Sequence, residues 1–65
     1  MKYIFQNDDI RLVIEEDIVG WYLFVYRDGN MNTPAADYLQ DTLNDVFEEA
    51  EEMFGVQHNQ WKKVC

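Results

Sequence analysis

Six consecutive large apolar residues, Trp-Tyr-Leu-Phe-Val-Tyr at 21–26, constrain the fold of this 65-residue chain more than any other segment. Aromatic and β-branched side chains favour an extended strand, and Gly20 before the run and Asp28-Gly29 after it are typical of turns. Successive side chains of a strand point to opposite faces of a sheet. Because both faces of this strand are apolar, we expect it to lie in the centre of a sheet.

One helix in so short a chain covers only one face of such a sheet. A domain of this size buries only about 60% of the surface that its unfolded chain exposes. The second face of the 20–27 strand, with Tyr22 and Tyr26, therefore has two interpretations. It is a partly exposed face whose tyrosine hydroxyls stay in water, or it is a surface for self-association.

Two further strands are predicted before the central one. Residues 3–6 begin with a short aromatic run, and Asn-Asp-Asp at 7–9 indicates a turn. At 10–16, Ile10, Leu12 and Ile14 occupy alternate positions, which is the pattern of a half-buried strand.

The second half of the chain contains a helical pattern. One apolar stripe is formed by Leu43, Val46, Phe47, Ala50 and Phe54. Thr42 is a suitable N-cap, with Asp45 three residues later, and Gly55 suits the left-handed end of the helix. We predict a helix at 42–54 after a short turn at 34–38. Because proline favours a first helical turn, a start near Pro34 stays open.

These segments predict one α+β domain over residues 1–65. The expected architecture is a three-stranded antiparallel β-meander (3–6, 10–16 and 20–27) packed against one C-terminal amphipathic α-helix. Trp61 and Val64 are expected to anchor the tail as a short strand or a one-turn helix. The predicted core consists of Leu12, Ile14, Leu23, Val46, Phe47, Ala50 and Phe54.

The formal net charge of −8 is concentrated in one segment, because residues 37–52 carry seven acids and no base. Such a field repels phosphates, which disfavours direct nucleic-acid binding and binding to an anionic membrane. The acidic side of the predicted helix is either a solvated face that keeps the protein soluble or a docking surface for a basic protein. In the second interpretation the contact residues are Asp45, Glu48, Glu49 and Glu52, with Tyr22 and Tyr26 as further candidates.

No catalytic, cofactor or metal site is predicted. The chain lacks serine, its one histidine (His58) lies in a polar run, and its one cysteine (Cys65) is the last residue, where a nucleophile is seldom held in place. Asp28-x-Asn30-x-Asn32 resembles the start of a calcium loop. Thr33 and Leu39 then stand where such a loop needs glycine and a bidentate glutamate, so a hairpin turn is the better interpretation.

Several short motifs occur in sequence: Gly-Trp-Tyr-Leu-Phe at 20–24, Leu-Gln-Asp-Thr-Leu at 39–43, Glu-x-Ala-Glu-x-x-Phe-Gly at 48–55, and Trp61. Together they resemble small bacterial proteins in which a strand hairpin leads into an acidic helix. The resemblance covers about two-thirds of the chain. It implies a compact α+β domain and no particular activity.

The sequence thus favours a non-catalytic interaction or regulatory module with a basic protein partner. A homodimeric structural protein is the alternative, and an inhibitor or DNA mimic directed at a nucleic-acid-binding protein is the third hypothesis. There is no apolar run of about 18 residues and no signal-peptide pattern, and a single cysteine fits a reducing compartment, so we expect a cytoplasmic bacterial or phage protein without a membrane span.

Overall fold

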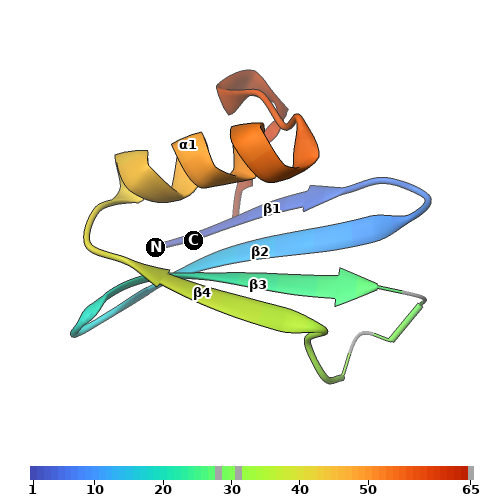
Figure 1. Cartoon of the computed structure of the whole chain (residues 1–65), viewed down its shortest axis with the longest axis horizontal. Coiled ribbons are helices and arrows are strands. Elements are labelled where there is room, and N and C mark those ends of the chain that lie inside the picture. Colours follow the sequence, from blue (N-terminus) through green and yellow to red (C-terminus); the bar gives the residue numbers. More distant parts are fainter. Residues whose placement is uncertain (28, 31, 65) are drawn as a thin grey trace.

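The computed structural model describes residues 1–27, 29–30 and 32–64, and within them five strands form one antiparallel sheet beside one α-helix (Figure 1). The order across the sheet is β4-β3-β2-β1-β5. The elements are β1 (Lys2–Gln6), β2 (Ile10–Asp17), β3 (Gly20–Arg27), β4 (Ala36–Gln40), α1 (Leu43–Phe54), a 3-10 turn η1 (His58–Gln60) and β5 (Lys62–Lys63). The α+β class is confirmed. The turn predicted at Asp28 and the hypotheses on Cys65 fall outside the described residues.

The expected meander is present as the middle of the sheet. Every residue of β2 pairs with β3, from Ile10 opposite Arg27 to Asp17 opposite Gly20. The β1–β2 turn is fixed by the side chain of Asn7, whose Oδ1 accepts the backbone N–H groups of Asp9 and Ile10 at 2.8 and 2.9 Å. The position of β3 between two partners agrees with its apolar residues on both faces.

The predicted count of three strands is wrong, because β4 and β5 extend the sheet at its two edges. The turn expected at 34–38 is replaced by β4, which pairs with β3 from Ala36 opposite Val25 to Gln40 opposite Trp21. The physical reason is that β3 has a second edge whose backbone groups need partners. Tyr38 faces the core, whereas Leu39 is 47% exposed on the opposite face of the sheet.

The helix begins directly after its N-cap residue Thr42. The alternative start near Pro34 is therefore wrong. The Oγ1 atom of Thr42 accepts the Asp45 N–H at 3.1 Å. At the other end Gly55 has a φ of 71° and donates its N–H to Glu51 O at 2.9 Å. The N–H of Val56 reaches Ala50 O at 3.5 Å, so the chain folds back over the helix as the glycine predicts.

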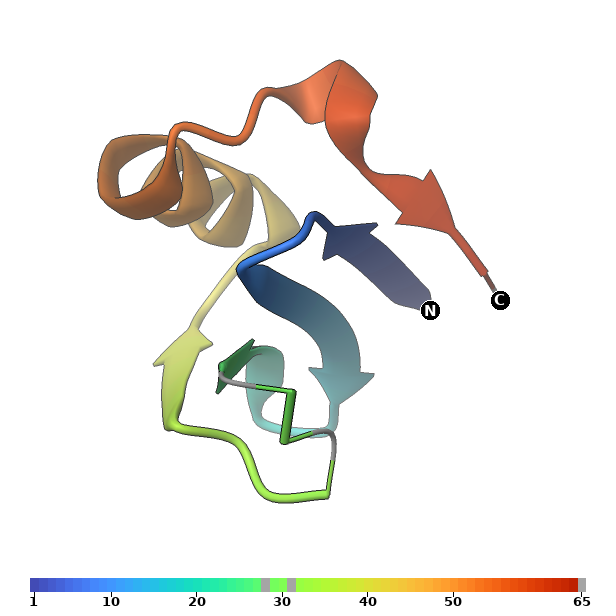
Figure 2. The same cartoon turned by 90° about the vertical axis from the view of Figure 1, so that its right-hand side faces the viewer.

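The tail contains both of the elements that were considered for it, a one-turn helix and a short strand. After η1 the chain runs beside β1, where Lys62 lies opposite Ile4 and the Val64 N–H donates to Lys2 O at 2.9 Å (Figure 2). Trp61 is half-buried, and its ring lies 5.9 Å from that of Phe47. Trp61 thus closes the side of the core between α1 and β1.

The core lies between α1 and the face of the sheet that carries the odd-numbered residues of β3. Its buried members are Leu12, Ile14, Leu23, Val25, Val46, Ala50 and Val56. Phe47 and Phe54 were expected to be buried but are only half-buried, because each lies on a flank of the helix stripe and packs against the core from the side. The Phe54 ring is instead covered by the Arg27 guanidinium, 5.6 Å from its centroid.

Gly20 provides a test of the β3–β4 pairing. It has a φ of 151°, and a Cβ placed on it would collide with the carbonyl oxygen of Gln40. We expect Gly20→Ala to lower the free energy of unfolding by about 2 kcal/mol or more, measured by urea unfolding. Gly29→Ala is the matched control, since Gly29 also has a positive φ of 73° but no atom within 4 Å of its Cβ position. That variant should lose about 1 kcal/mol. Equal losses would show that backbone conformation alone matters at Gly20.

Candidate functional site

The predicted contact residues lie on two opposite sides of the molecule. One side is the solvent-facing side of α1, which we call the helix surface; its exposed carboxylates are Asp45, Glu48, Glu51 and Glu52. The other is the face of the sheet that α1 does not cover, which we call the open sheet face. Its apolar residues are Ile4, Val13, Tyr22, Phe24, Tyr26 and Leu39. The sheet separates the tyrosines from the helix carboxylates, so the six predicted residues do not form one site.

The carboxylates of the helix surface are not neutralised by neighbours. Glu48 accepts a hydrogen bond from Asn44 Nδ2 at 3.1 Å, but no carboxylate of the helix surface forms an ion pair within residues 1–27, 29–30 and 32–64. Glu48 and Glu52 are four residues apart on one side of α1, where like charges repel. The last turn of α1 contains no basic residue to offset the negative end of the helix dipole.

Two acids close to this surface, Glu49 and Asp41, are not part of it. Glu49 is only half-exposed, and its Oε1 atom is buried without a hydrogen-bond partner, so Glu49 contributes little to the outer side of α1. Asp41 precedes the Thr42 cap and is outside the helix, so it makes no helical pair with Asp45. The helix surface therefore consists of the four exposed carboxylates Asp45, Glu48, Glu51 and Glu52.

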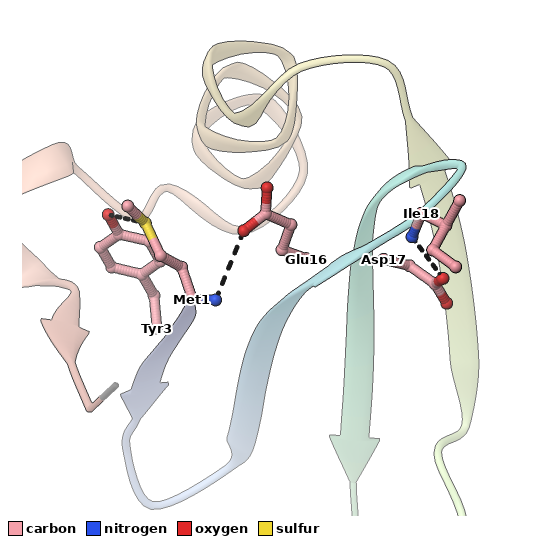
Figure 3. A network of polar contacts seen from close by, with 5 residues as sticks. All are labelled: Met1, Tyr3, Glu16, Asp17 and Ile18. Carbon is pink, nitrogen blue, oxygen red and sulfur yellow. Dashed lines mark hydrogen bonds and ion pairs between the residues drawn. The ribbon is translucent and has the colours of Figure 1, made fainter.

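Two ion pairs connect the start of β1 to the end of β2, away from the helix surface. The N-terminal amine of Met1 lies 3.5 Å from Glu16 Oε1 (Figure 3), and Lys2 Nζ lies 3.9 Å from Glu15 Oε1. All four side chains or termini are substantially exposed, so each pair contributes little to stability. Figure 3 also shows Asp17 and Ile18 at the tip of the β2–β3 hairpin, where Ile18 is fully exposed.

The open sheet face is aromatic along β3. Tyr22 and Phe24 point to it together, with their rings stacked at 5.5 Å between centroids and 15° between planes. Tyr26 lies two residues further along the same face, opposite Arg11 on β2. All three rings are half-buried although no helix of the described residues lies over them.

A hollow of about 400 Å³ opens beside the stacked pair. Its lining consists of Glu15, Glu16, Asp17, Tyr22, Phe24 and Asp37. Of the predicted contact residues only Tyr22 takes part, and Tyr26 does not. The alternation along β3 already placed Phe24 beside Tyr22, but Asp37 could not be located without β4.

The described residues show neither a metal centre nor a membrane span. No three acidic, histidine or cysteine side chains among them come close enough together to hold a metal ion. The Asn30 side chain of the calcium-like segment serves its own loop, where Oδ1 accepts the N–H groups of Asn32 and Thr33 at 3.0 and 3.2 Å. No helix in the described part of the chain is long and apolar enough to cross a membrane.

Comparison with known proteins adds no relative: no family model matches the sequence, and no curated protein or solved structure shows a match. The resemblance to small bacterial proteins with an acidic helix stays a prediction.

The repulsion on the helix surface gives a second test. We expect Glu52→Lys to raise the free energy of unfolding by about 0.5–1 kcal/mol, because the introduced lysine attracts Glu48 instead of repelling it and puts a cation near the helix C-terminus. Glu52→Gln, which removes the repulsion without adding attraction, should give a smaller gain. Thermal unfolding at low and high salt measures both, and added salt should reduce the gain. A gain that does not depend on salt would assign it to helix propensity instead.

Proposed function

We propose that this protein is a non-catalytic interaction module that docks a basic protein partner through its helix surface. The observation that carries the proposal is the set of exposed carboxylates Asp45, Glu48, Glu51 and Glu52 on a well-capped helix, none of which forms an ion pair within the described part of the chain. Their mutual repulsion destabilises the free helix by a few tenths of a kcal/mol per pair. A basic surface laid over α1 relieves that repulsion.

The shape of the helix surface supports docking rather than catalysis. A reaction site is usually a concave pocket that excludes water and holds groups around a substrate. The outer side of α1 is convex, and its carboxylates are exposed to solvent. Charges in such a place act over distance, so they increase the rate at which an oppositely charged partner arrives and orients.

The experiment compares two variants with the same change in net charge. We expect Glu48→Lys/Glu52→Lys to abolish binding of a blocked peptide of alternating lysine and glycine. Asp8→Lys/Asp9→Lys, in the exposed β1–β2 turn, should keep most of it. Titrations followed by amide chemical shifts at low ionic strength give the affinity and locate the contact. In the unaltered protein the shifts should centre on α1.

Two results would contradict the proposal. Equal loss in both double variants would show that only net charge attracts the peptide. Shifts confined to residues outside α1 would place the contact elsewhere.

A further inference from the structure

The open sheet face carries a second binding feature that is independent of the helix surface. Glu15 of β2 lies beside Tyr22, and Asp37 of β4 lies beside Phe24 on the other side. Because neighbouring strands are about 4.8 Å apart, these two carboxylates border the aromatic pair from strands about 10 Å apart. The hollow of about 400 Å³ lies among these four residues, Glu16 and Asp17.

We propose that this hollow binds an arginine side chain from a protein partner. A guanidinium group is planar and weakly hydrated, stacks on aromatic rings and donates paired hydrogen bonds to carboxylates. The stacked rings of Tyr22 and Phe24 supply the aromatic wall. Asp37 is exposed and forms no ion pair within the described residues, so it is available to a cation.

The arrangement of the acids favours an extended organic cation over a metal ion. Four acidic residues line the hollow, yet no three acidic side chains among the described residues converge to hold an ion. Acids spread along an aromatic wall suit a guanidinium at the end of an apolar stem, because the stem contacts the rings and the charged head reaches the carboxylates.

A second copy of the chain fits the same face poorly. In a two-fold dimer the same patch meets itself, so the acids around the hollow would face identical acids. Each chain also carries a formal net charge of −8. Charge complementarity therefore selects a basic segment as the occupant.

The hairpin tip next to the hollow offers apolar contact to residues that flank the arginine. Ile18 is 100% exposed and Val19 is 64% exposed, directly after Asp17 of the lining. Exposed aliphatic side chains beside a charged hollow are the arrangement of a docking surface, in which apolar contact accompanies a specific polar anchor.

The test uses three blocked tripeptides with glycine on both sides of arginine, lysine or citrulline, titrated into the full chain and followed by amide chemical shifts. We expect weak binding of the arginine peptide, with a dissociation constant on the order of millimolar. Shifts should centre on β2, β3 and β4 around the hollow. The lysine peptide should bind less tightly, and neutral citrulline should not bind. Equal binding of lysine or citrulline would overturn the proposal, as would shifts spread evenly over α1.

Two variants and two controls complete the experiment. Asp37→Asn should weaken binding of the arginine peptide about tenfold, since it removes a charge-assisted contact without changing shape. Phe24→Leu should weaken it while keeping an apolar residue on the sheet. Asp8→Asn, which changes net charge equally, should leave it unaltered, and Glu48→Lys/Glu52→Lys should still bind. Unchanged affinity in Asp37→Asn would overturn the proposal. If the amide chemical shifts of β3 change with protein concentration in the absence of any peptide, the open sheet face binds a second copy of the chain instead.

Discussion

The structure depends on the burial of one side of β3 under a single helix. Leu23 and Val25 are at most 1% exposed, and Val46 and Ala50 of α1 are fully buried against the same core. A two-layer arrangement of this kind leaves the other face of the sheet without a covering element. On that face the small apolar side chains are shielded from water by larger neighbouring side chains. Val13, for example, is only 4% exposed although it points away from α1. The aromatic rings that shield it are therefore also the surface that we propose for a partner.

The helix is stabilised by its capping residues and by the burial of its apolar stripe. Its outer carboxylates are not needed for either. Thr42 caps one end, and Gly55 with Val56 completes the other. The Arg27 guanidinium packs on Phe54 rather than pairing with a helix acid. Asp45 lies in the first turn, where an acid is favourable, whereas Glu48 and Glu52 repel each other, and Glu52 lies near the negative end of the helix dipole. The latter two acids therefore do not stabilise α1.

The sequence predicted the elements whose pattern is local, and it failed where pairing depends on a neighbour. The three strands of the meander and the helix ends follow from alternation and capping residues that stand within a few positions of one another. β4 lacked such a signal, because the spacing of Ala35, Leu39 and Leu43 imitates a helical stripe, while the residues that face the core are Ala36 and Tyr38. β5 consists of two lysines, which no strand propensity favours, and it forms because η1 returns the chain to the free edge of β1. Because β4 was not predicted, the hollow could not be predicted either. Tyr22 was identified from the sequence, but Asp37 comes close to it only through the pairing of β4 with β3.

The two proposed surfaces are electrostatically separate. This separation determines whether both can be occupied at the same time. At physiological ionic strength charges are screened beyond about 8 Å, whereas the domain measures 22 Å along its shortest axis, and the sheet and core lie between the two surfaces. Occupation of one surface therefore changes the field at the other very little. A rigid basic protein that covers α1 cannot at the same time place an arginine in the hollow, because the surfaces face opposite directions. Simultaneous use requires either two partners or one partner whose basic segment is flexible enough to pass around the edge of the sheet.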